Sequence, residues 1–380
     1  MRRLFALVAT VVLVDTMFYA AITPLLPHYV DDLGLSKSSA GVLSAAYAAG
    51  TLLGSLPSGW VATRFGARRT ILFGLTLMSA SSLAFAFASE IAVLDAARFM
   101  QGIGGACAWT GGLAWLLTMA PADRRGELIG SALAAAIVGV LLGPVLGGAA
   151  TVAGPEPIFS AVAVVGVALA AWARTLPAPP AATAPRVREL ARTMLSAPVL
   201  TGAWLVALPA LFAGTLNVLV PLRLDELGAS GVAIGAVFLV SAAVEAACTP
   251  LFGSLSDRRG RMVPIGAGLV AGGVTAVALT LPGTVLLVAV TVLAAILSLA
   301  LLWAPAMALL SDGAVARGLD LGFAAALVNL AWAGGQVIGG TGGAGIAEAT
   351  SDSVPYLLVA ALFALTSVTL LAAAGRLARA

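Results

Sequence analysis

Long apolar stretches recur along the whole chain, and they constrain its fold more than any other feature. Each is about 20 residues or longer, the length a helix needs to cross the hydrocarbon core of a bilayer. Short segments that contain Arg, Gly or Pro separate one stretch from the next. Charged residues make up only 10% of the chain, whereas soluble domains contain about 25%. This pattern predicts an all-α membrane protein with many membrane-spanning helices.

The stretches predict twelve helices in two groups of six. The first group covers residues 4–30, 39–62, 70–88, 91–118, 128–150 and 157–175, and the second covers 198–222, 230–254, 263–281, 284–310, 320–347 and 353–375. Residues 176–197 are rich in Pro and Arg, which suits a cytoplasmic linker better than another span. We therefore expect an N-terminal six-helix bundle at residues 1–175, the linker at 176–197, and a C-terminal bundle at 198–380. The first apolar run has no small-residue cleavage site before Pro24, so we expect a retained helix.

The arginines alternate between loops in a way that predicts the orientation of the chain. If the N-terminus is cytoplasmic, every basic residue falls on the cytoplasmic side except Lys37, Arg98 and Arg223. Cytoplasmic loops of membrane proteins carry such an excess of Lys and Arg. We expect a multi-pass protein of the cell membrane with both termini in the cytoplasm. The basic residues form no single patch, so no nucleic acid partner is expected.

Few residues offer chemistry for an enzyme. Cys107 and Cys248 both lie in apolar stretches and have neither disulfide nor metal-ligand spacing. The sole histidine, His28, lies at the outer end of the first helix, as an interfacial residue or as part of a proton relay. The chain has no Gly-rich phosphate-binding motif ending in Lys and Ser or Thr, and its only lysine is Lys37. We expect no enzyme, no ATP-driven pump, and no metal or other cofactor; a structural or receptor-like membrane protein remains an alternative.

Two loops indicate an internal repeat. GWVATRFGARR starts at Gly59 and GSLSDRRGRM starts at Gly253, and both place Arg five positions and Gly seven positions after the first Gly. The loops follow the second helix of each group, so the two halves look duplicated in parallel. Such repeats place a substrate site near the middle of the bilayer and work by rocking one half against the other. The alternative is that Gly and Arg simply form a tight turn in both places.

The same loops resemble the G-x-x-x-D-R-x-G-R-R motif of the major facilitator superfamily. The resemblance implies a twelve-helix major facilitator fold with a latch between helices on the cytoplasmic side. The residues that match are Gly59, Arg64, Gly66, Arg68 and Arg69 in the first copy, and Gly253, Asp257, Arg258, Gly260 and Arg261 in the second. Thr63 replaces the acid of the first copy, so the latch of that half departs from the motif.

Three further motifs resemble the drug:proton antiporter group of this superfamily, which includes the vesicular monoamine transporters. DTMFYAAITPLLP, which begins at Asp15, is similar to the first-helix motif of the group, and RFMQGIGGA matches R-x-x-Q-G-x-G at Arg98, Gln101 and Gly102. GVLLGPVLGG is similar to the fifth-helix motif associated with antiporters, at Gly139, Gly143, Pro144, Gly147 and Gly148. Glycines four residues apart make a smooth helix face for close packing, and Pro144 permits a bend.

Asp15, Glu245 and Arg98 are the candidate proton-coupling residues. A charged Asp15 facing lipid would cost about 2.5–3.5 kcal/mol at a helix centre, so we expect it to face the protein interior. There it could exchange a proton or pair with a substrate cation, and competition for one carboxylate would couple the two in opposite directions. The alternative is that Asp15 pairs with Arg98 only to hold helices together. Glu245 and Arg98 could likewise be buried ties between helices.

Polar and aromatic residues of several helices are candidates for the wall of a substrate cavity. Aromatic faces attract cations, and amides can adapt to varied substrates. Besides Asp15, the candidates are Tyr19, Gln101, Asn217, Asn329, Trp332 and Gln336. Each of these could instead serve helix packing, and Trp109, Trp115 and Trp303 could equally be interfacial or packing residues.

The function that these features favour is proton-coupled efflux of lipophilic or cationic small molecules by alternating access. The expected partners are the small-molecule substrate, protons and the lipid bilayer, and we expect a monomer. Export of a sugar, an amino acid or a secondary metabolite is the second hypothesis, and uptake by symport is the third. A superfamily fold alone does not define the substrate.

Overall fold

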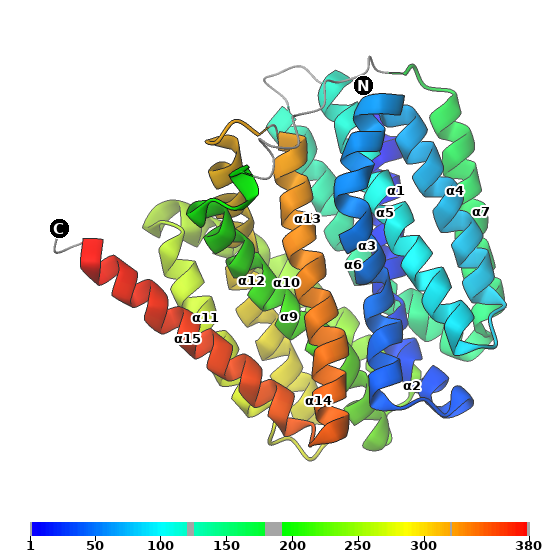
Figure 1. Cartoon of the computed structure of the whole chain (residues 1–380). Coiled ribbons are helices and arrows are strands. Elements are labelled where there is room, and N and C mark those ends of the chain that lie inside the picture. Colours follow the sequence, from blue (N-terminus) through cyan, green and yellow to red (C-terminus); the bar gives the residue numbers. More distant parts are fainter. Residues whose placement is uncertain (1, 120–124, 179–191, 320, 378–380) are drawn as a thin grey trace.

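The computed structural model describes residues 2–119, 125–178, 192–319 and 321–377, which form long helices joined by short loops (Figure 1). The helices of the first half are α1 (Arg2–Ala20), α2 (Ile22–Leu33), α3 (Lys37–Phe65), α4 (Ala67–Ala86), α5 (Ile91–Met119), α6 (Arg125–Ala153) and α7 (Pro155–Arg174). Those of the second half are α9 (Ala197–Glu226), α10 (Gly231–Arg259), α11 (Met262–Ala278), α12 (Val285–Val315), α13 (Leu321–Val337), the π-helical turn η2 (Ile338–Gly342), α14 (Gly343–Ala349) and α15 (Ser353–Leu377).

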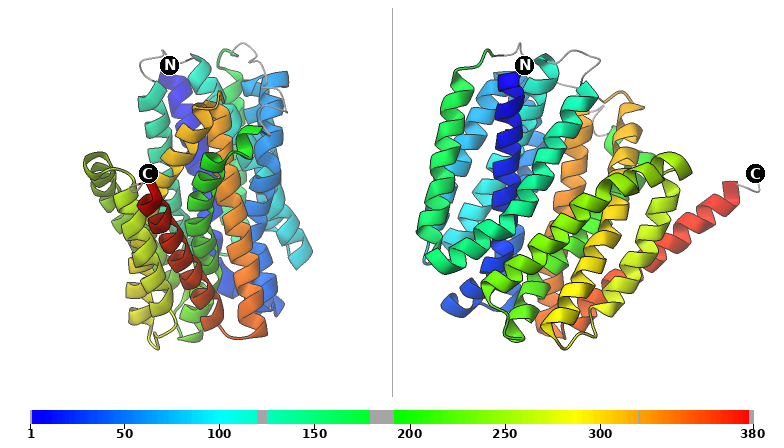
Figure 2. Two further views of the ribbon diagram at one scale, coloured as in Figure 1. Left: turned by 60° about the vertical axis from the view of Figure 1, so that its left-hand side comes forward. Right: turned by 180° about the vertical axis from the view of Figure 1, so that it is seen from behind.

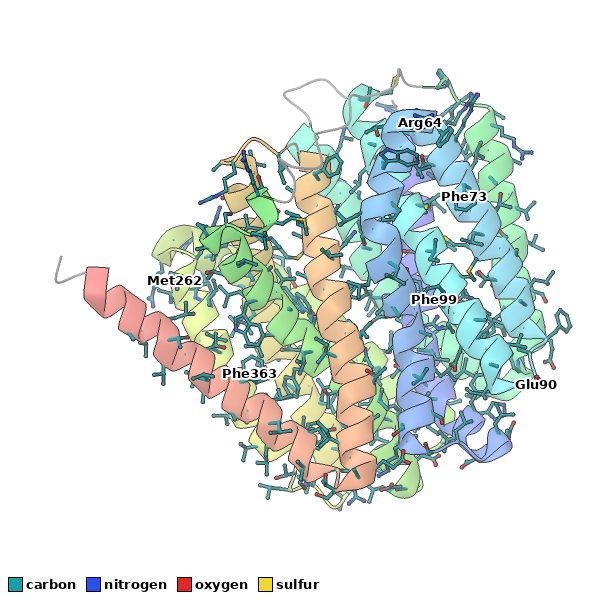
Figure 3. The ribbon with its side chains drawn as sticks, viewed as in Figure 1. Arg64, Phe73, Glu90, Phe99, Met262 and Phe363 are labelled. Carbon is teal, nitrogen blue, oxygen red and sulfur yellow. The ribbon has the colours of Figure 1, made fainter. Side chains whose placement is uncertain are left out.

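The predicted twelve-helix fold is confirmed. Within the described ranges, 10 helical segments are long and apolar enough to cross a membrane, with α1 and α2 counted as one and α13 to α14 as another. The shorter apolar helix α11 and the 29-residue α5 complete the predicted set. Many large apolar side chains lie on the outside, such as Phe73 (Figure 3), Val164 and Leu371, which are 55%, 68% and 73% exposed. Such an apolar exterior suits contact with lipid.

The first span is broken in its middle, close to its prolines. α1 ends at Ala20 and α2 begins at Ile22. Pro24 has no N–H group for the carbonyl of Ala20, and its ring crowds that carbonyl, so a regular helix is interrupted there. The sequence predicted one helix over residues 4–30, and the structure breaks it at Ala21, just before Pro24.

The two halves repeat the same local structures 194 residues apart. Ser36 caps α3 and Ser230 caps α10, and each hydroxyl accepts a hydrogen bond from the backbone N–H three residues later. Gly66 and Gly260 end the same two helices with φ of 88° and 79°, a region that only glycine enters easily. The predicted parallel repeat therefore extends to helix caps and turns.

The two ends of the bundle are distinguished by their charged residues. α3 begins at Lys37 and carries Arg64 in its last turn, so we call the two ends of the bundle the Lys37 end and the Arg64 end. Glu90 marks the Lys37 end in Figure 3.

Two sets of helices join the halves. α3 packs along α13 and α14, and α6 packs on α10. In Figures 1 and 2, α15 and its neighbour α11 lean away from the first half towards the Arg64 end.

Candidate functional site

The Asp15 carboxyl group is completely buried and holds two hydrogen bonds from neutral donors. Oδ1 accepts from the Tyr47 hydroxyl at 2.7 Å, and Oδ2 accepts from Nε1 of Trp109 at 2.8 Å. The three residues come from α1, α3 and α5. Both carboxylate oxygens are thus satisfied inside the first half without a cation in direct contact, an arrangement in which the group can either carry a proton or bind a positive charge.

Close packing of α3 on α5 makes this arrangement possible. A methyl group at Gly102 would overlap the carbonyl of Tyr47, and one at Gly105 would lie 2.5 Å from both Asp15 Oδ1 and the Tyr47 hydroxyl. Real Cβ atoms do not approach other atoms so closely, and so glycine is required at both positions for this geometry.

Arg98 is buried beside this carboxyl group but bonds to the end of α1. Its guanidinium donates to the carbonyl oxygens of Phe18 at 3.2 Å and Tyr19 at 3.1 Å, and to Oε1 of Gln101 at 3.3 Å. A cation is favourable at the C-terminal end of a helix, where backbone carbonyls lack helical partners. Among the residues that the structure describes, no ion pair joins Arg98 to Asp15 directly. The alternative of a simple Asp15–Arg98 pair is therefore not the observed geometry.

Tyr19 connects the carboxyl site to the second half. Its ring packs against Tyr47 with centroids 5.1 Å apart and against Trp332 of α13 at 5.3 Å. Its hydroxyl accepts a hydrogen bond of 3.3 Å from Nδ2 of Asn217 on α9. We call the resulting group the Asp15 cluster. It comprises Asp15, Tyr19, Tyr47, Trp109, Asn217 and Trp332.

The other predicted site residues lie outside the Asp15 cluster. Gln101 is buried and reaches it through Arg98. Gln336 is buried on α13, and Asn329 is half-buried one to two turns earlier on the same helix. Glu245 is half-buried on α10, and no ion pair among the described residues includes it. The structure thus brings part of the predicted cavity wall into contact, and Asn329 and Gln336 lie on α13 three residues before and four residues after Trp332 of the cluster.

Sequence analysis missed two members of the cluster. Tyr47 was not singled out, and Trp109 was interpreted as an interfacial or packing residue. A signal for Trp109 was present, because positions 98, 101, 105 and 109 lie on one face of a helix and carry Arg, Gln, Gly and Trp. Tyr47 stands alone among small residues in SAAYAAG, which is a weaker signal.

The glycines of the fifth-helix motif pack against the first span. Methyl groups at Gly139, Gly143 and Gly147 would each collide with the backbone of residues 13–21. The methyl group at Gly143, for instance, would lie 2.8 Å from the carbonyl oxygen of Met17. A methyl group at Gly235 of α10 would lie 2.9 Å from the carbonyl of Pro144, while one at Gly148 has only distant contacts. The motif therefore lies between the helix that carries Asp15 and the second half.

The residues of the predicted latch make their contacts within their own halves. Arg64 stacks on Trp60, with the guanidinium carbon 5.6 Å from the ring centroid, and Arg68 donates to the carbonyl of Leu176 at 3.1 Å. Arg261 pairs with Asp312 at 2.6 Å.

The other residues of the predicted latch have few described contacts. Arg69 and Arg258 are exposed, Gly253 lies in open space, and the side chain of Asp257 lies outside the described part of the structure. Gly59 alone faces the other half, where a methyl group would lie 3.5 Å from the ring of Phe323.

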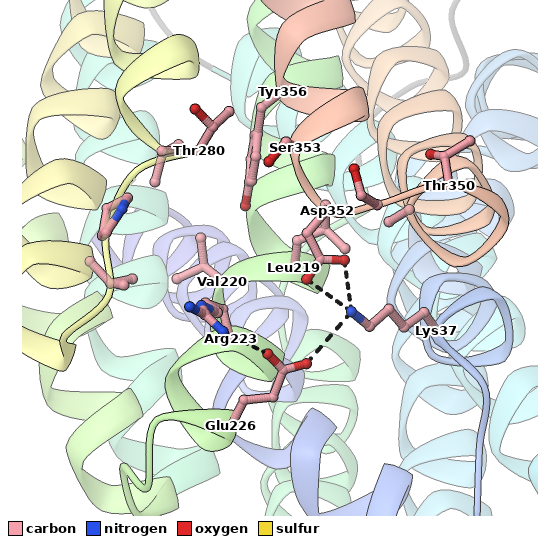
Figure 4. Close-up of a pocket in the computed structure, with 15 residues that line it drawn as sticks. Lys37, Leu219, Val220, Arg223, Glu226, Thr280, Thr350, Asp352, Ser353 and Tyr356 are labelled. Atoms are coloured by element: carbon pink, nitrogen blue, oxygen red, sulfur yellow. Dashed lines mark hydrogen bonds and ion pairs between the residues drawn. The ribbon is translucent and has the colours of Figure 1, made fainter.

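At the Lys37 end, by contrast, charged groups join the halves (Figure 4). Nζ of Lys37 lies 2.7 Å and 2.8 Å from the two carboxylate oxygens of Asp352 and 3.6 Å from Glu226. The backbone N–H of Ser38 donates to Glu348 at 2.7 Å. These contacts border a cavity of about 430 Å³ that Arg223 and Tyr356 also line. The sequence placed Lys37 only in an outer loop and gave no sign of its acidic partners.

Comparison with protein families agrees with the fold. The model described as "Major Facilitator Superfamily" matches residues 8–222 and 203–378 of the chain. The first match covers the first half and most of α9, and the second begins within α9 and covers the rest of the second half.

Curated relatives match over part of their length. The "Probable vesicular acetylcholine transporter-B" of Danio rerio is 35% identical over 156 residues, which are 39% of this chain and 32% of the relative. The "Quinolone resistance protein NorA" of Staphylococcus aureus is 32% identical over 127 residues, which are 33% of each chain. These alignments span about a third of the length of the relatives.

Solved structures match over nearly the whole chain. A POT family transporter in complex with a thioalcohol-conjugated peptide has a TM-score of 0.78, 13% identity, and coverage of 98% of this chain and 96% of its own. A D-xylose-proton symporter has a TM-score of 0.73, 20% identity, and coverage of 96% and 95%. At this level of identity the similarity concerns the fold.

Proposed function

The chain belongs to the Major Facilitator Superfamily, and from this premise we propose that it is a secondary transporter that exchanges protons for lipophilic or cationic small molecules. Membership establishes a membrane transporter; the coupling ion and the substrate class are our proposal. Names of two relatives, a vesicular acetylcholine transporter and a quinolone resistance protein, are compatible with cationic or drug-like substrates.

The observation that carries the proposal is the environment of Asp15. An ionised carboxylate deep in the membrane is unfavourable unless it is paired or hydrogen-bonded. Among the described residues only the neutral donors Tyr47 and Trp109 hydrogen-bond to it, and the Arg98 guanidinium acts on it without forming an ion pair. A proton or a substrate cation would bind the carboxylate directly, and the two would compete for the same group.

The Asp15 cluster provides a way to transmit this competition between the halves. Tyr19 follows Asp15 by one helix turn and contacts Asn217 and Trp332 of the second half. A substrate that binds between these side chains would separate or reorient contacts that now join the halves. We propose that the aromatic rings of Tyr19 and Trp332 form one wall of the substrate site, and that Glu245 contributes a second carboxyl group from α10.

The charged contacts support alternating access with the Lys37 end closed. Lys37 links α3 to Asp352 and Glu226 of the second half, whereas at the opposite end Arg68 and Arg261 bond within their own halves. The excess of arginine at the Arg64 end favours a cytoplasmic location for that end. We propose that the structure is open towards the cytoplasm and that the protein lies in the plasma membrane with both termini in the cytoplasm. We also propose that the monomer is the transporting unit.

The proposed bundles are residues 1–175 and 198–380. Of the linker between them, residues 179–191 lie outside the described part of the chain.

Transport by reconstituted protein tests the proposal. In proteoliposomes with an imposed pH gradient, the wild type is expected to accumulate the lipophilic cation tetraphenylphosphonium and to release protons in exchange, followed with an entrapped pH-sensitive dye. Asp15→Asn cannot exchange the proton, so we expect it to lose both signals. Asp31→Asn, the same chemical change at an exposed position of α2, serves as the matched control. Undiminished antiport by Asp15→Asn would refute the role of this carboxyl group.

A further inference from the structure

Four buried polar side-chain atoms of the described residues have no hydrogen-bond partner, and all four belong to the first half. They are the Tyr29 hydroxyl on α2, and Oδ1 of Asp95, Nε of Arg98 and Nε2 of Gln101 on α5. A buried polar atom without a partner costs about 1–3 kcal/mol, and each such atom in a folded protein needs an explanation. Their common location indicates one shared cause.

The four atoms lead from the Lys37 end towards Asp15. α5 begins at Ile91 at that end, and a helix rises about 1.5 Å per residue, which places Asp95, Arg98 and Gln101 about 6, 10 and 15 Å from its start. Residues three apart are neighbours on a helix surface. Arg98 interacts electrostatically with both Asp15 and Tyr29, so the series ends beside the proposed proton site.

The chemistry of these groups suits bound water. The carboxylate oxygen of Asp95 accepts hydrogen bonds, Nε of Arg98 and Nε2 of Gln101 donate them, and the Tyr29 hydroxyl can do both. Buried water in proteins typically makes about 3 hydrogen bonds to polar atoms that otherwise lack partners. Phe18, Phe85 and Phe159 pack with ring centroids 4.9 to 6.4 Å apart and, with Tyr29 against Phe85 at 5.7 Å, form an apolar wall beside the series.

We propose that a file of bound water joins these four groups, and that Asp95 and Tyr29 relay protons between Asp15 and the surface at the Lys37 end. In one direction, the Asp15 carboxyl group gives a proton to the water file and the Asp95 carboxylate takes one up. The file lies within the first half, apart from the substrate wall at Tyr19 and Trp332. The route rests on the proposed proton exchange at Asp15.

The charged surroundings limit how this route can conduct. The ionisable groups that act on Arg98 are Asp15 and the tyrosines Tyr19, Tyr29 and Tyr47. Those that act on Tyr29 are Arg98, Glu156 and Asp32. The fixed positive charge of Arg98 lies in the middle of the file and opposes passive flow of hydronium ions. The route is therefore expected to carry protons during the transport cycle without acting as an open channel.

Two transport assays on the full chain distinguish a proton relay from a structural role. In proteoliposomes, tetraphenylphosphonium uptake driven by a pH gradient requires net proton transfer, whereas exchange of labelled for unlabelled tetraphenylphosphonium without a gradient does not. For Asp95→Asn and Tyr29→Phe we expect gradient-driven uptake to fall about a hundredfold, the low end of the contribution of a positioned proton-transfer group. Exchange should stay at the wild-type rate, and Asp95→Glu should restore gradient-driven uptake. Asp31→Asn is the control for loss of an exposed carboxyl group.

Each other outcome has a definite meaning. Wild-type gradient-driven uptake by both Asp95→Asn and Tyr29→Phe would overturn the relay while leaving the role of Asp15 intact. Equal loss of uptake and exchange would show that the residues maintain structure and would also overturn it. If the wild type exchanges substrate but shows no proton movement, the proposed function fails, and the relay fails with it.

Discussion

At the scale of single residues, the Asp15 site depends on what surrounds the carboxyl group. Asp15 is 0% exposed, and its partners Tyr47 and Trp109 are neutral. Gly105 provides the space in which the Tyr47 hydroxyl meets Asp15. The observed geometry thus combines one acid, two donors and a glycine beside them.

Gly105→Ala is expected to disrupt this site without unfolding the protein. The new methyl group would lie 2.5 Å from both Asp15 Oδ1 and the Tyr47 hydroxyl, so the hydrogen bond between them must break or lengthen. Loss of a hydrogen bond to a charged group corresponds to about 1.5–3 kcal/mol, and we expect proton-coupled uptake to fall about tenfold or more. Uptake in proteoliposomes measures the effect.

The matched control is Gly266→Ala on α11, where a methyl group meets nothing within 4 Å. It should transport like the wild type and have an unchanged melting temperature. Wild-type uptake by Gly105→Ala would show that the observed spacing around Asp15 is unimportant for coupling.

At the scale of helices, the first span combines a break with a closely packed neighbour. α1 ends at Ala20, and Arg98 bonds to the carbonyls of its last turn. α6 presents Gly139, Gly143 and Gly147 to the same region. Small residues allow two helix backbones to approach closely in a membrane, where packing is the main source of helix association. The helix that carries Asp15 is therefore held on one side by glycines and on the other by an arginine.

Gly143→Val tests this packing. Even a methyl group at Gly143 would collide with Cβ of Ala20 and would lie 2.8 Å from the carbonyl oxygen of Met17, so these atoms would have to move. Such overpacking typically costs about 1–3 kcal/mol. We expect a lower melting temperature in detergent, measured by scanning fluorimetry, and slower transport. Gly148→Ala of the same motif has its nearest contact at 3.9 Å and should melt like the wild type. Equal melting temperatures for both variants would contradict the packing of α6 on α1.

At the scale of the whole molecule, the halves are joined by different means at their two ends. The Lys37 end has ion pairs from α3 to Asp352 and Glu226. Their side chains are 31–45% exposed, and pairs that solvent reaches are individually weak, about 0–1 kcal/mol. At the Arg64 end, arginines bond within their own halves. The contacts at the Lys37 end are therefore easily reversed.

Covalent cross-linking of the Lys37 end is expected to stop transport. We would introduce Lys37→Cys and Asp352→Cys into a chain whose native cysteines, Cys107 and Cys248, are replaced by Ala. A short bifunctional thiol-reactive reagent that forms a disulfide with each of the two cysteines would prevent the halves from separating there. Uptake should stop on treatment and return on reduction, whereas each single-cysteine variant should be unaffected. Continued transport by fully cross-linked protein would show that this end does not open.

Much of this architecture was predictable because bilayers impose simple rules on sequence. Helix positions follow from runs of apolar residues, and the predicted span 91–118 differs from α5 only at its last residue. The paired glycines Gly66 and Gly260 were visible from the repeat and end equivalent helices in the structure. The repeat does not extend to the chemistry, since the position 194 residues after Asp15 is Pro209. The site was less predictable, because Tyr47 lies 32 residues from Asp15 in the chain and nothing in its local pattern marks it.

The sequence by itself determined that this chain spans a membrane as two related six-helix halves, with an acid on the first helix, because hydropathy, arginine placement and glycine turns act locally. Only the tertiary structure decided that Tyr47 and Trp109 hold Asp15, that Arg98 bonds to the end of α1, and that Lys37 reaches acidic residues of the other half. These contacts join residues far apart in the chain, and they depend on how closely glycine-lined helices approach. Backbone packing of this kind is set by many helices together, so no single segment encodes it.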